Sequence, residues 1–224
     1  MNNQKTILIY TITYKPLLGG AEVAVDEVVK RLPDFNFIIV TARLDSKLLK
    51  FEQQYPNVEV HRVGIPGFNI VSKNLYVLFA LWWGLRNVVK RDVDIVWGVL
   101  ESYGAMTAAL LKLCVHDVFY VMTMQDGSSD EFWRRRVGWW KLLFKKAYHL
   151  ADHITAISNY LIRRAREYYH YTGPITLVAN AVSDQFDKEI SAERKQEIRR
   201  LWGVEKNDKV IFTASRLVQK NGID

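Results

Sequence analysis

Short apolar runs, separated by longer amphipathic segments, are the feature of this sequence that most limits its fold. Runs such as Thr6–Ile12, Phe37–Thr41 and Ile95–Val99 are largely apolar and do not alternate with polar residues. Strands of this kind are usually buried on both faces, as in a parallel sheet covered by helices. The other predicted strands are Val58–Val63, Phe119–Thr123, Ile154–Ile157, Ile175–Ala179 and Val210–Ala214.

Helical periodicity fills the intervals between these strands. In Ala21–Leu32 the apolar residues Ala21, Ala24, Val25, Val28 and Leu32 share one face. Further helices are predicted at 44–54, 74–91, 103–113, 129–150, 159–170 and 191–201. This alternation of strands and helices predicts an α/β fold with a Rossmann-like, doubly wound parallel sheet.

The chain changes character near its carboxyl end. Residues 186–206 are highly charged and poor in large apolar groups, and we interpret them as a linker helix. They separate a first domain, 1–185, from 207–224, where Val210–Ala214 would open a second Rossmann-like domain. We expect that second domain to be truncated at Asp224, and the chain alone to be inactive.

Composition and charge narrow the function classes. The chain of 224 residues is 49% hydrophobic and carries a formal net charge of +7. This charge favours an anionic partner, either a phosphate-bearing substrate or a membrane surface, and the absence of a nucleic-acid motif argues against nucleic acid. The one cysteine, Cys114, lies in an apolar run and is predicted to be a buried thiol. We therefore expect the protein in the reducing cytoplasm. It could also lie peripherally at the cytoplasmic face of the membrane.

The longest apolar stretch, Leu75–Leu85, is shorter than the roughly 20 residues that cross a bilayer. A second segment, 132–151, has the pattern of a basic amphipathic helix, which suits an anionic membrane surface. The alternative is that its apolar face is simply core. Its basic residues are Arg134, Arg135, Arg136, Lys141, Lys145 and Lys146, and its apolar residues are Trp133, Val137, Trp140, Phe144, Ala147 and Ala151.

Candidate binding residues follow three of the predicted strands. Gly19 and Gly20 open the Ala21 helix, whose free amides suit a phosphate, although an ordinary turn would look the same. Gln125 and Asp126 follow Phe119–Thr123, where they could bind sugar hydroxyls or cap a helix. The cations Arg216 and Lys220 follow Val210–Ala214, where they could meet a diphosphate or line a solvated loop.

Other patterns weigh against cofactor and metal chemistry. The glycine turn is not G-x-G-x-x-G, which disfavours a nicotinamide or flavin site. Asp92-Val93-Asp94 spells the D-x-D of metal-dependent sugar transfer, but it directly precedes a buried strand and is interpreted as a turn. No zinc-site spacing is present. We therefore expect neither metal nor cofactor.

Taken in order, these segments resemble family 4 glycosyltransferases of the GT-B fold. The resemblance rests on Gly19–Glu22, "DIVWG" at Asp94–Gly98, "VMTMQD" at Val121–Asp126, "ADHITAISNYL" at Ala151–Leu161, "ITLVANAVSDQF" at Ile175–Phe186 and "ASRLVQKNGID" at Ala214–Asp224. It implies a hexosyltransferase-type enzyme that moves a sugar, with retention, from a nucleotide-sugar co-substrate to a glycan or lipid-linked acceptor. Residues 1–185 would be the acceptor-side domain, acting in polysaccharide or glycolipid synthesis.

The resemblance also implies residue roles. Gly19, Gly20, Arg216 and Lys220 would bind the donor phosphates, and Glu101, Gln125 and Asp126 would line the acceptor side. Gln125 stands where many members carry a histidine. Glutamine cannot shuttle a proton, so no catalytic residue is assigned. Two rival functions stay open: a GT-B nucleotide-sugar epimerase and a non-catalytic carbohydrate- or membrane-binding module.

Overall fold

The structure is a computed structural model that describes residues 4–127, 140–181, 189–205 and 207–214. The chain separates into two compact units, Met1–Asn180 and Ala181–Asp224. The domain limits predicted at residues 185 and 206 stay predictions.

The first unit is built on one eight-stranded sheet with the order β3-β4-β2-β1-β5-β6-β7-β8. Neighbouring strands are parallel except for β3, which runs antiparallel to β4 at the edge. The strands are β1 (Thr6–Tyr10), β2 (Asn36–Ala42), β3 (Phe51–Tyr55), β4 (Val58–Val63), β5 (Val93–Val99), β6 (Phe119–Met124), β7 (His153–Ala156) and β8 (Ile175–Leu177). The first seven strands predicted from the sequence are confirmed, with ends that differ by a few residues.

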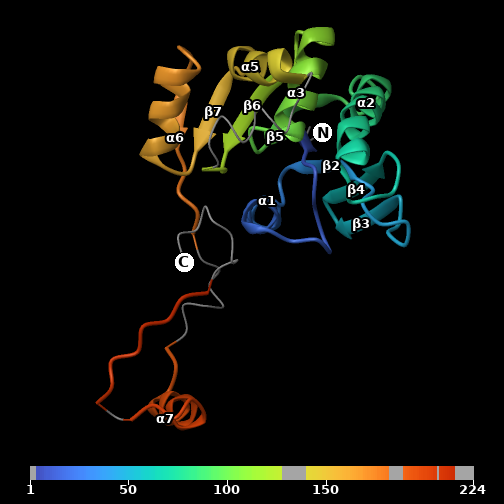
Figure 1. The fold of residues 1–224 in the computed structure, drawn as a ribbon. Helices are drawn as coiled ribbons and strands as arrows, with labels where there is room; N and C mark the ends of the chain where they lie inside the picture. The colour runs from blue at the N-terminus through green and yellow to red at the C-terminus, as the bar shows by residue number, and fades with distance from the viewer. Residues whose placement is uncertain (1–3, 128–139, 182–188, 206, 215–224) are drawn as a thin grey trace. The chain divides into compact units, whose positions relative to one another are not determined.

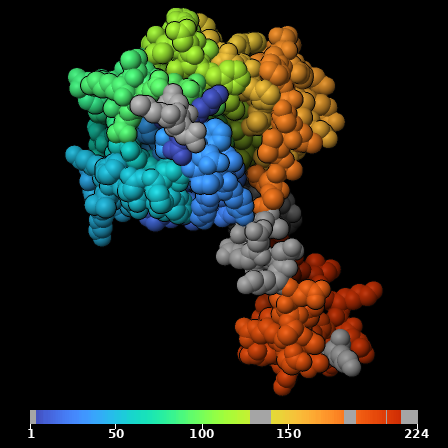
Figure 2. All heavy atoms as spheres, turned by 180° about the vertical axis from the view of Figure 1, so that it is seen from behind, coloured from blue at the N-terminus to red at the C-terminus, as the bar shows by residue number. Residues whose placement is uncertain are grey.

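Helices cover both faces of this sheet. Figure 1 shows α1 (Gly20–Arg31) on the opposite side from α2 (Ile70–Asn87), α3 (Tyr103–Cys114) and α5 (Lys141–Leu150). α6 (Asn159–Arg163) continues as the π-helical turn η2 (Arg164–Tyr168). Figure 2 shows the blue-green atoms of α2 at the surface of the first unit.

The sheet is therefore doubly wound, as the sequence predicts. β1 lies between β2 and β5. The chain reaches β2 through α1 and β5 through α2, and these two helices lie on opposite faces of the sheet. In such sheets the connections diverge at the carboxyl ends of the two central strands, and ligands bind in that crevice. The loops after β1, β5 and β6 are thus the places to look for a site.

Two predicted elements are wrong. Residues 44–54 do not form a helix, because Phe51–Tyr55 is the edge strand β3, whose polar residues pair with β4. Val210–Ala214 forms no strand, and Ile211 is 99% exposed. A strand needs a hydrogen-bonded neighbour, and none of the described residues supplies one.

Two burial predictions also fail. Cys114, the last residue of α3, is exposed. On α1 the buried face carries Glu22 and Asp26, whereas Val28 and Leu32 are exposed. The polar pair turns inward because partners in neighbouring loops satisfy it, as described below.

The described part of the second unit contains α7 (Ala192–Leu201), which confirms the helix predicted at 191–201. Its N-cap is Ser191, whose hydroxyl accepts a hydrogen bond from the Arg194 amide at 3.2 Å. None of its residues is buried. In both units, none of the described helices is long and apolar enough to cross a membrane.

Glycine allows α3 to lie unusually close to the two central strands. A Cβ at Gly104 would come within 2.4 Å of the Tyr10 carbonyl oxygen and 2.6 Å of the Val99 carbonyl oxygen. The start of α3 therefore packs directly on the carboxyl ends of β1 and β5, so Gly104 fixes the geometry of the crevice.

We predict that Gly104→Ala lowers the free energy of unfolding by about 3 kcal/mol, because the backbone must move to admit a methyl group. Urea denaturation of both proteins measures this difference. Gly20→Ala is the matched control, since a Cβ there meets nothing within 4 Å, and it should stay within about 1 kcal/mol of wild type. An unchanged midpoint for Gly104→Ala would contradict the packing argument.

Candidate functional site at the carboxyl edge of the sheet

The loop after β1 is anchored by a buried carboxylate on α1. Oδ1 of Asp26 accepts hydrogen bonds from the Tyr14 and Tyr55 hydroxyls at 3.1 and 3.0 Å. Lys15 Nζ lies 2.7 Å from the same oxygen, and Lys30 Nζ lies 2.7 Å from Oδ2. Burial alone would raise the pKa of Asp26, but the hydrogen bonds from Lys15, Lys30 and Tyr55 outweigh it and hold that pKa below its ordinary value.

A second carboxylate closes the glycine turn. The Gly19 amide donates to Oε2 of Glu22 at 2.8 Å, and the Thr13 hydroxyl donates to Oε1 of the same side chain. The Gly19 amide is therefore already used inside the loop. The amides of Gly20 and Ala21, at the start of α1, have no acceptor within the helix and are the ones left for an anion. Both glycines are exposed.

After β5 the chain turns sharply and buries Glu101. Leu100 has a φ of 65°, in the left-handed region that non-glycine residues rarely adopt, and such outliers concentrate at functional sites. The side chain of Glu101 is buried, with the residue 1% exposed. Its Oε2 accepts hydrogen bonds from the main-chain amides of Gln125 and Asp126 at 3.1 and 3.3 Å. Glu101 thus fastens the segment after β6 to the end of β5.

Arg164, at the start of η2, joins the same cluster. Its Nη2 lies 3.7 Å from Oε1 of Glu101, and its Nη1 donates to the Asp126 carbonyl oxygen at 3.2 Å. Burial raises the pKa of Glu101 to about 7, although Arg164 and the two amides pull it down. Sequence reasoning missed Arg164, which lies inside a predicted helix and carries no motif.

The main chain of Gln125 and Asp126 is held by Glu101 through its amides and by Arg164 through the Asp126 carbonyl oxygen. Oε1 of Gln125 is buried and has no hydrogen-bond partner among the described residues. A buried amide oxygen without a partner costs free energy, so a ligand that donates to it gains affinity. This oxygen is the clearest sign of a binding position at the edge.

The structure brings together most of the residues predicted for the site. Gly19 and Gly20 follow β1, Glu101 follows β5, and Gln125 and Asp126 follow β6, so all five lie at the carboxyl edge of three adjacent strands. Glu101 is buried beneath the segment after β6, and its predicted place on the acceptor side stays a prediction. The predicted phosphate-binding residues Arg216 and Lys220 lie outside the described residues.

The basic segment 132–151 is described only from Trp140 onward, so Arg134, Arg135 and Arg136 lie outside the described residues. In α5 the apolar residues Phe144 and Ala147 are buried in the core, whereas Lys141, Lys145 and Lys146 are exposed. For this described half, the core alternative holds.

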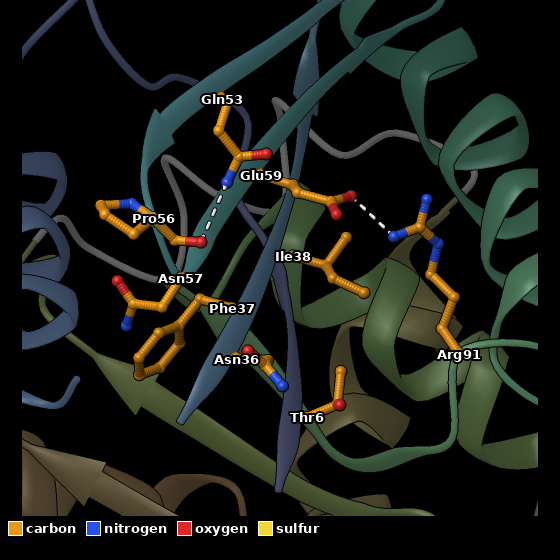
Figure 3. A pocket seen from close by; sticks show the side chains of 9 residues that line it. All are labelled: Thr6, Asn36, Phe37, Ile38, Gln53, Pro56, Asn57, Glu59 and Arg91. Atoms are coloured by element: carbon orange, nitrogen blue, oxygen red, sulfur yellow. Dashed lines mark hydrogen bonds and ion pairs between the residues drawn. The ribbon is translucent and has the colours of Figure 1, made fainter. Parts of the chain in front are cut away.

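A separate hollow of about 320 Å³ lies at the opposite, amino-terminal edge of the sheet. Figure 3 shows its side chains, which come from β1, β2, β3, β4, the turn between β3 and β4, and Arg91. Arg91 Nη1 lies 2.6 Å from Oε2 of Glu59, and Gln53 Nε2 donates to nearby main-chain carbonyl oxygens. These polar groups already have protein partners, so the carboxyl edge remains the stronger candidate for a ligand-binding site.

The D-x-D sequence has a structural role. Oδ2 of Asp94 accepts a hydrogen bond from the Thr6 amide at 2.8 Å, which ties β5 to the start of β1. Asp92 lies in the turn before β5, as predicted, whereas Val93 and Asp94 already belong to the strand. Across the described residues, no three His, Cys, Asp or Glu side chains cluster closely enough to hold a metal ion.

Comparison with known proteins gives a family and a fold. The model of glycosyltransferase family 4 matches residues 18–186. Sucrose-phosphate synthase from Thermosynechococcus elongatus is similar in structure, with a TM-score of 0.65 at 10% identity over 91% of this chain and 53% of that one. No curated protein sequence matches this chain significantly.

Two further solved structures share the fold. A UDP-N-acetylglucosamine 2-epimerase has a TM-score of 0.56 at 10% identity, over 88% of this chain and 55% of that one. A UDP-glucose:anthocyanidin 3-O-glucosyltransferase in complex with UDP has a TM-score of 0.53 at 11% identity, over 90% and 58%. The chain thus spans about half the length of these three structures, and the likeness establishes the Rossmann-like sheet of the GT-B fold.

We predict that ionisation of Glu101 destabilises the protein. Its pKa is about 7 in the folded state against an ordinary 4.5, so between these values the folded state binds more protons than the unfolded chain. The free energy of unfolding contributed by Glu101 therefore falls as pH rises through this window, by on the order of 3 kcal/mol.

Urea denaturation between about pH 5 and about pH 7.5 tests this, with Glu101→Gln as the comparison because its amide oxygen can still accept from the two main-chain amides. His61 contributes with the opposite sign, since burial lowers its pKa below 6.5. Both proteins share that term, so the difference between them isolates Glu101. Parallel pH profiles would contradict the prediction.

Proposed function

Because this chain belongs to glycosyltransferase family 4, we propose that it transfers a hexosyl group, with retention, from a nucleotide sugar to a glycan or lipid-linked acceptor. The observation that carries the proposal is the polar carboxyl edge, where the glycine turn and Gln125 lie on neighbouring connections of a GT-B sheet. Its product would belong to cell-surface polysaccharide or glycolipid synthesis.

The donor side of the proposal rests on the start of α1. The amides of Gly20 and Ala21, which have no acceptor within the helix, and the positive end of the helix dipole favour the negative diphosphate that leaves when its bond to the donor sugar breaks. Arg216 and Lys220 are proposed to neutralise the same diphosphate. Asp26, with its lysine and tyrosine partners, holds this loop in place and therefore acts as a positioning residue.

The acceptor side of the proposal rests on Gln125. Its buried Oε1 can accept a hydrogen bond from a sugar hydroxyl, and Asp126 lies beside it. The amide can bind and orient but cannot take a proton, so the hydroxyl proton must pass to another group, such as an oxygen of the departing phosphate. No metal or cofactor is required by this scheme, in which the nucleotide sugar is a co-substrate.

Two other functions remain distinguishable. A nucleotide-sugar epimerase would alter the donor without any acceptor, and the likeness to the epimerase fold keeps this candidate in view. A non-catalytic module would bind glycan or lipid without nucleotide affinity. We favour a cytoplasmic enzyme, peripheral to the membrane when its acceptor is lipid-linked.

We predict that Gln125→Ala lowers kcat/KM for transfer about 10- to 100-fold, because one hydrogen bond to a substrate hydroxyl is lost at a buried position. The assay follows acceptor-dependent release of nucleoside diphosphate by the full-length protein with a panel of labelled nucleotide sugars and glycan or lipid-linked acceptors. Val28→Ala, on the exposed face of α1, is the matched control and should leave the rate unchanged.

If the protein converts the nucleotide sugar when no acceptor is present, its function is epimerisation and not transfer. Glycan binding without measurable nucleotide affinity in calorimetry would replace it by a binding module. Equal rates for wild type and Gln125→Ala would remove Gln125 from the acceptor site while leaving sugar transfer itself standing.

A further inference from the structure

Helix α2 is apolar on two faces, and only one of them is used by the fold. Tyr76, Val77 and Ala80 face inward and are fully buried. Large apolar residues also run along the opposite face, where they recur every three, four or seven residues as one helix face requires. This outer stripe consists of Val71, Leu78, Phe79, Trp82 and Leu85 on α2 and Val89 in the turn directly after it, all exposed, with Trp82 at 54% and Val89 at 81%.

Leu78, Phe79, Trp82 and Leu85 of the stripe lie within Leu75–Leu85, the longest apolar run of the sequence. A helix on the surface of a soluble domain normally pairs one apolar face with one polar face. The outer face of α1 follows that rule, because Glu27, Lys30 and Arg31 lie on it in ion pairs. The outer stripe of α2 breaks the rule, and a contiguous apolar patch of this kind usually marks a surface that meets a partner.

Charge indicates what kind of partner. Ile70–Arg91 contains four cations and no acidic residue. Among them, Arg86 and Lys90 are exposed beside the stripe, and the guanidinium of Arg86 lies 4.1 Å from the centre of the Trp82 ring. The helices on the same face, α3 and α5, also contain no aspartate or glutamate. The helices α2, α3 and α5 therefore favour an anionic partner and offer no carboxylate to a copy of themselves.

We propose that the outer stripe of α2 docks in the plane of a bilayer that contains anionic lipid. Trp, Phe and Leu side chains would enter the boundary between headgroups and acyl chains, while Arg86 and Lys90 meet lipid phosphates. The proposal differs from docking through 132–151, because the outer stripe lies on another helix, and Phe144 and Ala147 of that segment are buried in the core. It stands independently of sugar transfer, since it uses neither the carboxyl edge nor any residue placed there.

Vesicle co-sedimentation of the full chain tests the proposal. Binding should be strong to vesicles of phosphatidylcholine with about 30% phosphatidylglycerol and weak to phosphatidylcholine alone. The double variant Leu78→Ser/Trp82→Ser should bind at least about tenfold more weakly, and it should fold because both side chains are already exposed. Val28→Ser, an exposed apolar residue on the opposite face of the sheet, is the control and should bind like wild type.

Charge reversal distinguishes binding to anionic lipid headgroups from binding through apolar contacts alone. Arg86→Glu/Lys90→Glu should abolish the preference for anionic vesicles, whereas Lys195→Glu/Arg200→Glu on α7 changes the net charge equally and should keep it. Equal losses in both variants would mean that net charge alone drives binding, which overturns the proposal.

A fluorescent label locates the contact. In a Cys114→Ser background, an environment-sensitive dye attached at Val89→Cys should shift to the blue on anionic vesicles, and the same dye at Val28→Cys should not. Three results overturn the proposal: no binding to either vesicle, a blue shift at position 28 only, or a concentration-dependent dimer in light scattering that Leu78→Ser/Trp82→Ser dissolves.

Discussion

The buried carboxylate of Glu101 is the interaction on which the candidate site depends. It reaches from the end of β5 to the main-chain amides after β6 and pairs with Arg164 from η2, so three separate segments converge on one side chain. Removing a carboxylate from water is costly unless such partners compensate. The pKa near 7 shows that the compensation is incomplete, and the protein keeps this arrangement where the segment after β6 must be held in place.

The loop after β1 is also held by buried carboxylates. Asp26 and Glu22 are buried on α1; Asp26 accepts hydrogen bonds from Tyr14 in the loop after β1 and from Tyr55 in β3, and Glu22 accepts one from the Gly19 amide in that loop. Two carboxylates thus preorganise the glycine turn, while Gly104 lets α3 close against the strand ends. Such preorganisation suits the proposed sugar transfer, because charge that develops on a leaving diphosphate is best stabilised by groups that need not move.

The sequence predicts the sheet well because its central strands are apolar on both faces, which leaves few alternatives. It fails at β3, where Phe51–Tyr55 is a polar edge strand that looks helical without its partner, and at Val210–Ala214, whose apolar character does not create a neighbour to pair with. The positions of Gly19, Gly20 and Gln125 follow from motif and strand order. The buried orientation of Glu101 and Asp26 could not be foreseen, because it depends on partners distant in sequence, Arg164 and Tyr55.

The most direct test of the central claim is hydrogen–deuterium exchange of the full-length protein with and without a nucleotide sugar and an acceptor analogue. If ligands bind at the carboxyl edge of β1 and β6, the amides in 13–21 and 125–127 exchange more slowly when the ligands are present. Protection confined to the opposite edge, around Asn36, Glu59 and Arg91, would contradict it.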